Sequence, residues 1–160
     1  PNAGKSSLLA SITNANPKIA NYQFTTLNPN LGVASYDDKE ITLADIPGLI
    51  EGAHKGTGLG IQFLKHIERC KTLLHLIDIT NKNIEVAYNQ VKKELKNYSS
   101  DLLMKKEIIV LNKIDLVDEK LVKEIIDKFS KKINCEILTL STFDKKSVSK
   151  IKTKLISYVF

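Results

Sequence analysis

The first seven residues contain the groups that bind phosphate in nucleotide sites. They match the last six positions of the pattern G-x-x-x-x-G-K-[ST] and one further serine. In such a loop backbone N–H groups cradle the β-phosphate, the lysine reaches the β and γ oxygens, and the first hydroxyl binds Mg²⁺. We therefore expect a phosphate loop formed by Pro1, Asn2, Ala3, Gly4, Lys5, Ser6 and Ser7.

A second candidate group follows an apolar run and opens a glycine-rich stretch. Asp45 ends the run, and five glycines occur between residues 48 and 60. A carboxylate at a strand end can hold Mg²⁺ through water, and a glycine N–H three residues later can contact a γ-phosphate. The stretch therefore predicts a phosphate-sensing loop that includes Asp45, Ile46, Pro47 and Gly48.

The polar connection between residues 20 and 32 contains two threonines that could complete a metal site. A threonine hydroxyl can ligate Mg²⁺ while its backbone N–H touches the γ-phosphate. Spacing does not choose between Thr25 and Thr26, and a plain surface loop leading into a strand is the alternative. The candidate nucleotide-binding residues are Phe24, Thr25, Thr26, Leu27 and Asn28.

A third group, Asn112, Lys113, Ile114 and Asp115, directly follows an apolar run. Asp115 can accept hydrogen bonds from both N1–H and the exocyclic amine of guanine, a donor pair that adenine lacks. Asn112 can bridge the base and the phosphate loop, and the stem of Lys113 can cover the ring. This arrangement predicts a site that selects GTP and argues against an ATPase.

A last strand leads into Ser141, Thr142 and Phe143. A backbone N–H in this segment could contact guanine O6, although a simple strand-to-helix turn explains these three residues equally well.

All these groups need a sheet whose strands end at one edge. Apolar periodicity predicts a helix that ends near residues 14–17, a hairpin of strands 32–36 and 41–46, and a helix over 61–69. Strands 73–79, 107–111 and 137–140 should alternate with helices 84–98, 119–133 and a C-terminal helix. Val86, Leu121 and Val159 are assigned to inner helix faces. The result is a single three-layer α/β domain over residues 1–160.

Composition limits the remaining possibilities. The net charge of +6 comes from lysine, because Arg69 is the only arginine, and it reflects either genome composition or a surface that faces RNA. No signal peptide or long apolar span occurs, which predicts a cytoplasmic protein without a membrane segment. Cys70 and Cys135 lack metal-ligand spacing and should be reduced thiols. His75, within an apolar run, is expected to be structural.

Together these motifs resemble the G domain of the Obg family of GTPases. The most specific part is residues 45–60, supported by residues 1–7, 24–32, 62–69 and 112–115. The resemblance implies a Ras-like P-loop NTPase fold, mostly parallel with one antiparallel strand. It implies a truncated domain, because the start of the phosphate loop and its preceding strand are missing.

The resemblance also assigns roles. Ser6 and Thr26 become Mg²⁺ ligands, Asp45 binds Mg²⁺ through water, and residues 112–115 and 141–143 read guanine. The last segment departs from the family's commoner Ser-Ala pattern. The family further implies a role in assembly of the large ribosomal subunit, contact with the subunit or its rRNA, and sensitivity to stringent-response guanine nucleotides. We expect a monomer.

Catalysis is expected to be slow. Leu49 occupies the position where many GTPases place a water-orienting glutamine, and residues 20–32 contain no arginine. Missing parts of this kind cost roughly three to five orders of magnitude in rate. Lys5 can stabilise charge, and the resemblance suggests that Asn2 holds K⁺ where an arginine finger would place its charge. The alternative function is a nucleotide-gated ribosome-binding or stress-sensing module in which occupancy matters more than hydrolysis.

Overall fold

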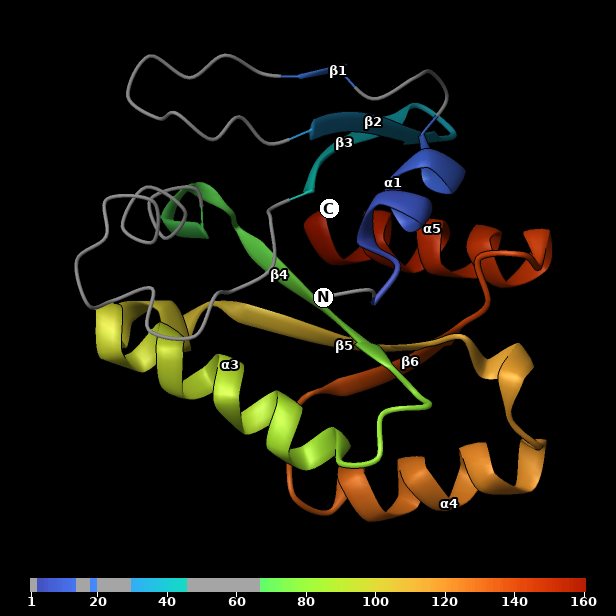
Figure 1. The fold of residues 1–160 in the computed structure, drawn as a ribbon. Coiled ribbons are helices and arrows are strands. Elements are labelled where there is room, and N and C mark those ends of the chain that lie inside the picture. The colour runs from blue at the N-terminus through green and yellow to red at the C-terminus, as the bar shows by residue number, and fades with distance from the viewer. Residues whose placement is uncertain (1–2, 14–17, 20–29, 46–66) are drawn as a thin grey trace.

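The structure, a computed structural model, describes residues 3–13, 18–19, 30–45 and 67–160 (Figure 1). Its strands are β1 (Lys18–Ile19), β2 (Asn30–Tyr36), β3 (Lys39–Asp45), β4 (Thr72–Asp78), β5 (Lys106–Asn112) and β6 (Glu136–Leu140). Its helices are α1 (Lys5–Ile12), α3 (Ile84–Tyr98), α4 (Glu119–Ser130) and α5 (Lys145–Val159), with short 3₁₀ turns η2 (Ser100–Met104) and η3 (Ile114–Leu116).

Strands β4, β5 and β6 form a parallel sheet with β5 in the centre. Alternate residues of β5 point to opposite faces, as the period of a strand requires. Ile108 and Val110 join one apolar core, and Ile109 and Leu111 join another, and all four are fully buried. This explains why β5 has a continuous apolar sequence, as predicted for a strand covered on both faces.

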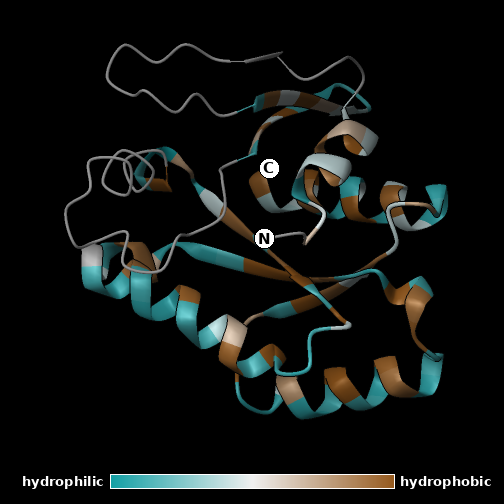
Figure 2. Ribbon diagram, viewed as in Figure 1, coloured by the Kyte–Doolittle hydropathy of each residue, from teal (hydrophilic) through white to brown (hydrophobic). Residues whose placement is uncertain are grey.

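Helices cover both faces of this sheet and complete the three layers (Figure 1). Helices α1 and α5 pack on the face of Ile108, and α3 and α4 pack on the face of Ile109. Figure 2 shows the central part of β5 in the hydrophobic colour, whereas the helices alternate between hydrophilic and hydrophobic residues. The predicted α/β layering is therefore confirmed.

The predicted hairpin is present, but it belongs to a separate antiparallel sheet of order β1-β2-β3. The turn is shorter than expected because β3 begins at Lys39, and Asp37 adopts a left-handed conformation with φ 52°. No ladder joins β3 to β4 among the residues that the structure describes. The antiparallel part is thus larger than the single strand that we expected.

The antiparallel sheet of β1, β2 and β3 approaches α1 closely at Gly32. A Cβ atom built on Gly32 would lie 2.1 Å from Cγ2 of Thr13 and 2.9 Å from Cδ1 of Leu9. A side chain at this position would force Thr13 and Leu9 to move, so glycine allows β2 to lie close across the end of α1. Gly32 therefore helps to fix the position of the hairpin that carries Asp45.

Three side chains assigned to inner helix faces are exposed instead: Val86 is 57% exposed, Leu121 44% and Val159 40%. In α3 the packed residues are Ile84, Tyr88, Val91 and Leu95, and a residue two positions after Ile84 lies on the opposite side of a helix. Leu121 lies in the first turn of α4 beside the packed residue Val122, and Val159 is the last residue of α5. These three assignments were wrong.

Residues 67–69 are helical, but the rest of the predicted helix over 61–69 lies outside the described residues. Cys70 and Cys135 are both free thiols, and burial raises the pKa of each, as expected for structural cysteines. Within the described ranges, no helix has the length and apolarity to cross a membrane.

Candidate nucleotide site

The structure brings two of the predicted magnesium-binding groups together. Ser6 lies in the first turn of α1, and Asp45 is the last residue of β3, 39 positions later. The hydroxyl of Ser6 donates a hydrogen bond of 2.6 Å to Oδ2 of Asp45. Two motifs that are distant in the sequence therefore converge on one point beside the N-terminus of α1.

The phosphate loop is also tied to the predicted base-reading segment. Nδ2 of Asn112, at the end of β5, donates to the carbonyl oxygen of Ala3 over 2.8 Å. Gly4 caps α1 with φ 94°, and a Cβ atom there would lie 2.4 Å from the same Nδ2. Only glycine satisfies both the left-handed backbone and this contact. Asn112 thus connects β5 to the phosphate loop, which is the loop half of the predicted bridge, and its contact with a base stays a prediction.

Lys113 is fixed by a residue that the sequence reasoning missed. Its Nζ lies 2.5 Å from Oδ2 of Asp78, the last residue of the neighbouring strand β4. Asp78 Oδ1 also accepts from the backbone N–H and the hydroxyl of Thr80, over 2.9 and 2.7 Å. The sequence signal was available, because an acidic residue ends a parallel strand at the same edge as Asn112, its register partner.

The charge state of Asp78 follows from these contacts. Partial burial acts to raise the pKa of Asp78, but the hydrogen bonds from Lys113 and Thr80 outweigh it and hold the pKa below its ordinary value. Asp78 is therefore ionised at neutral pH and anchors the ammonium of Lys113. The backbone of Lys113 has a strained left-handed φ of 66°. Together with the ion pair to Asp78, this backbone conformation helps to set the direction of the aliphatic part of the side chain.

Asp115 and the segment 141–143 lie at the same edge of the sheet, where β5 and β6 end. Asp115 is in the exposed turn η3, and Phe143 is 88% exposed in the connection to α5. Thr142 is half-buried, and the N–H of Ser141 donates to the hydroxyl of Ser147 over 3.0 Å. The structure therefore places all the predicted base-reading segments together.

Two polar atoms at this edge remain unpaired. In the described part of the chain, Oδ1 of Asn112 and Oγ of Ser141 are buried side-chain atoms without a hydrogen-bond partner. Buried polar groups are nearly always satisfied, so each such atom needs an explanation. Both belong to residues predicted to surround guanine, whose polar edge would supply partners.

Several predicted site residues lie outside the described residues and cannot be placed. They are Pro1 and Asn2 of the phosphate loop, Phe24, Thr25, Thr26, Leu27 and Asn28 of the first switch, and Ile46, Pro47, Gly48 and Leu49 of the second. Their roles stay predictions. Of the phosphate loop, the structure describes Ala3, Gly4, Lys5, Ser6 and Ser7, at the start of α1.

The donor set suits magnesium. A hydroxyl and a carboxylate are hard oxygen ligands, and Mg²⁺ is bound by one or two such protein groups together with waters and substrate phosphates. Ser6 and Asp45 supply both groups at one point. Elsewhere among the described residues, no cluster of three His, Cys, Asp or Glu side chains could hold a metal ion.

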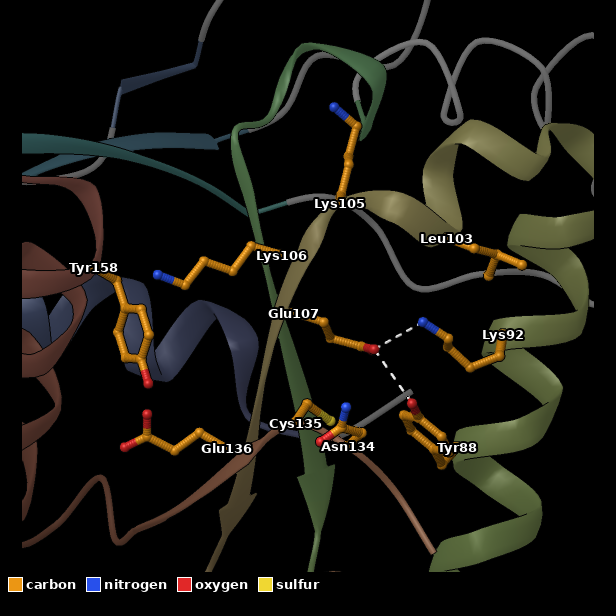
Figure 3. Close-up of a pocket in the computed structure, with 10 residues that line it drawn as sticks. All are labelled: Tyr88, Lys92, Leu103, Lys105, Lys106, Glu107, Asn134, Cys135, Glu136 and Tyr158. Carbon is orange, nitrogen blue, oxygen red and sulfur yellow. Dashed lines mark hydrogen bonds and ion pairs between the residues drawn. The ribbon is translucent and has the colours of Figure 1, made fainter.

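A cavity of about 420 Å³ lies at the opposite edge of the sheet, where β5 and β6 begin (Figure 3). Both glutamates in its lining form ion pairs. Glu107 accepts from Lys92 over 2.8 Å and from Tyr88 over 3.3 Å, and Glu136 pairs with Lys154 over 3.0 Å. Of the other lysines in the lining, Lys105 donates to the carbonyl oxygens of Glu68 and Cys70 over 2.8 and 2.7 Å, and the ammonium of Lys106 lies 3.9 Å from the centre of the Tyr158 ring.

His75 has the structural role that its apolar context predicted. Its Nδ1 lies 3.1 Å from Oε1 of Glu107, and its ring stacks on Tyr88 with 5.5 Å between centroids. Burial and the nearby Glu107 raise the pKa of Tyr88, so its hydroxyl stays protonated and can donate to Glu107.

The chain is similar to proteins named GTPase Obg. The sequence is 75% identical to the protein from Pelagibacter ubique (strain HTCC1062) over 159 residues, which are 99% of this chain and 49% of that protein. It is 54% identical to the protein from Rickettsia massiliae (strain Mtu5) over 151 residues, 94% of this chain and 46% of that protein. The chain thus spans about half the length of the curated relatives it matches.

Solved structures support the same fold. Era in complex with MgGDPNP and nucleotides 1506–1542 of 16S ribosomal RNA superposes with a TM-score of 0.73 and 25% identity, over 99% of this chain and 53% of that one. The pattern of the family described as "50S ribosome-binding GTPase" matches residues 1–113, which include the phosphate loop, Asp45 and Asn112. The resemblance to Obg is therefore confirmed, and the chain belongs to the 50S ribosome-binding GTPase family.

Proposed function

We propose that this chain is the nucleotide-binding domain of a magnesium-dependent switch that hydrolyses GTP slowly to GDP and phosphate. The observation that carries the proposal is the convergence of three motifs at one sheet edge. Ser6 reaches Asp45 over 2.6 Å, and Asn112 reaches the carbonyl of Ala3 over 2.8 Å. Phosphate, metal and base groups thus meet at the carboxyl ends of the strands, where open α/β sheets bind ligands.

The residues of this edge have distinct tasks in the proposal. Lys5 and the N-terminus of α1 attract the phosphates, because both carry positive charge. Ser6 with Thr26 would hold Mg²⁺, which neutralises phosphate charge when bound, and Asp45 would act through water. Asp115 would accept the two guanine donors. The ion pair with Asp78 would hold Lys113 in place beside the base.

The slow rate follows from what this chain lacks at the reacting phosphate. Leu49 cannot orient a water molecule by hydrogen bonding, and Arg69 is the only arginine in the sequence and lies beyond the glycine-rich loop. We propose that K⁺ held by Asn2 supplies the charge that an arginine finger would otherwise bring. Such a charge is worth about three to five orders of magnitude in rate.

Hydrolysis can be measured on a chimera in which this chain replaces the matching segment of the full-length Pelagibacter relative. We expect GTP turnover in KCl to exceed turnover in NaCl at least tenfold, with ATP hydrolysed in neither salt. Phosphate release under single-turnover conditions with Mg²⁺ is the measurement. Equal GTP turnover in the two salts would refute the role of K⁺, whereas absence of GTP binding would refute the proposed function itself.

Replacing Gly4 with Ala in this chimera should disrupt nucleotide binding. The substitution forces an L side chain into a left-handed conformation, at about 1–2 kcal/mol. It also displaces the side chain of Asn112, whose Nδ2 would lie 2.4 Å from the new Cβ atom. We expect GTP affinity, measured by titration calorimetry, to fall at least tenfold.

A matched control for this change is Ala10→Gly in the same helix. Ala10 is exposed, and glycine there costs about 1 kcal/mol through helix propensity alone. We expect a similar loss of stability in urea but unchanged GTP affinity. If the two variants bound GTP equally well, the tight contact at Gly4 would have no part in the site.

We further propose that the partner of the switch is the large ribosomal subunit or its rRNA, in the cytoplasm. The description of the family as ribosome-binding supports this, and the neighbouring structure of Era contains 16S ribosomal RNA. Asp115 would also recognise the base of stringent-response guanine nucleotides. More of the chimera should co-sediment with purified 50S subunits in GTP than in GDP. Equal co-sedimentation in the two nucleotides would contradict a switch.

A further inference from the structure

Helix α5 carries nearly all the net positive charge of the chain. Residues 145–160 contain five lysines and no acidic residue. Of the 24 basic residues, 19 therefore remain in residues 1–144, against 18 acidic ones, which leaves +1 of the total +6 for the other nine-tenths of the chain. The excess charge is a local property of one helix.

Helix α4, on the other face of the sheet, shows that lysine alone does not create such a surface. It holds three lysines, and three acidic residues alternate with them, namely Glu119, Glu124 and Asp127. The exposed face of α4 is therefore electrically balanced, whereas that of α5 is not. Balanced charges such as those on α4 are sufficient to keep a protein surface soluble.

Before its C-terminal residue Val159, the exposed side of α5 consists of lysine and hydroxyl residues. Its exposed residues before Val159 are Lys145, Lys146, Ser149, Lys150, Thr153 and Ser157. Lys146 and Lys150 are four positions apart, which places them on one face, about 6 Å along the axis. Lysine, serine and threonine are the side chains that contact phosphate oxygens in nucleic-acid complexes.

The apolar side of α5 is not available to a lipid surface. Val148, Ile151, Leu155 and Ile156 are all at least nine-tenths buried against the sheet and α1. Figure 2 shows α5 with its hydrophobic segments interrupted by hydrophilic ones along its whole length. A helix that lies in a membrane interface needs a free apolar face, and α5 has already used its own in the core.

Contacts within the chain limit the basic surface to the first part of the helix. Lys154 pairs with Glu136 over 3.0 Å and lies over the ring of Tyr158. The C-terminal residue Phe160 lies beneath Lys39 of the acidic hairpin turn. Lys146 and Lys150, by contrast, are exposed and lie next to Ser149 and Thr153.

We propose that this face, defined by Lys145, Lys146, Ser149, Lys150 and Thr153, binds the phosphate backbone of an RNA helix. The inference rests on the proposed function for the choice of RNA as the partner, and it adds the surface that makes the contact. The recognition is electrostatic, because lysines release counterions from phosphates and read no base sequence. The RNA then lies along α5, next to the edge of the sheet where the predicted base-reading segment 141–143 is found.

The test compares two double variants of the full-length chimera. K146A/K150A removes two charges from α5, and K120A/K123A removes two exposed charges from the balanced face of α4. Binding to a 20-base-pair RNA duplex is measured by fluorescence anisotropy between 50 and 200 mM KCl. We expect the α5 variant to bind about tenfold more weakly at 100 mM and the slope of log affinity against log salt to fall by about 2.

The other outcomes are equally decisive. Equal losses for the α4 and α5 variants would overturn the assignment of the face, as would tighter lysine-dependent binding to phosphatidylserine vesicles than to the duplex. GTP affinity is measured on the same samples and should be unchanged, because neither pair of lysines contacts the nucleotide edge. A chimera that fails to bind GTP but keeps the α5 effect would refute the proposed function and leave this interface standing.

Discussion

Replacing Asp115 with Asn is expected to weaken GTP binding at least a hundredfold and to create binding of xanthosine triphosphate. The carboxylate accepts from both N1–H and the amine of guanine, and hydrogen bonds to a charged group contribute about 1.5–3 kcal/mol each. An asparagine amide offers one acceptor and one donor instead. This pair matches xanthine, which has N1–H and a carbonyl at those positions.

The exposed position of Asp115 makes the experiment clean. It lies in the turn η3, and no buried residue occurs in that turn, so the substitution should not disturb the core. Affinities for GTP and for the xanthine nucleotide would be measured on the full-length chimera by competition with a fluorescent analogue. Asp118→Asn is a matched control, because Asp118 is exposed three residues later and its side chain makes no capping hydrogen bond. Unchanged preference for GTP in the Asp115 variant would contradict the assigned role.

Replacing Glu107 with Ala should give the second large effect, on stability. The side chain of Glu107 is only 7% exposed, and it accepts from His75, Lys92 and Tyr88. Removal leaves Lys92 and His75 beside the apolar core without their anion, and breaking a buried ion pair in this way costs about 3–5 kcal/mol. Because Lys92 is 26% exposed and can turn to solvent, we expect about 3 kcal/mol in urea unfolding.

The same cluster predicts a pH dependence. Burial acts to raise the pKa of Glu107, but the hydrogen bonds from His75 and Lys92 prevail, so its folded pKa lies below the ordinary value. A depressed folded pKa means that the stabilisation is complete above the unfolded pKa of about 4.3 and is lost as the pH falls through the lower folded value. Wild type should therefore lose stability in this acid range, and Glu107→Gln should lose less.

Glu136→Ala is the control for this prediction. Glu136 borders the same cavity and pairs with Lys154, but the two side chains are 35% and 44% exposed. Exposed ion pairs contribute about 0–1 kcal/mol, so this variant should unfold almost as wild type does. A loss at Glu107 no larger than the loss at Glu136 would show that the buried cluster is not a stabilising unit.

The candidate site could be anticipated from the sequence to the extent that its motifs are local. Asn112 and Asp115 directly follow an apolar strand, and Gly4 directly precedes a helix, so neighbouring residues define their backbone setting. Asp78 was missed although it also ends a strand, because a single acidic residue forms no motif. Its importance depends on a contact with Lys113, which is 35 positions away.

The amino-acid sequence by itself determined the order of helices and strands, the burial of β5 and the identity of the phosphate and base motifs. These depend on periodicity and on adjacent residues. Only the tertiary structure decided that Ser6 meets Asp45, that Val86 is exposed and that Glu107 has three partners. It also decided that, within the described residues, the sheet of β1, β2 and β3 shares no ladder with the sheet of β4, β5 and β6. The reason is physical: these features are set by packing between segments that are distant along the chain, where side-chain volume and long-range pairing outweigh local preference.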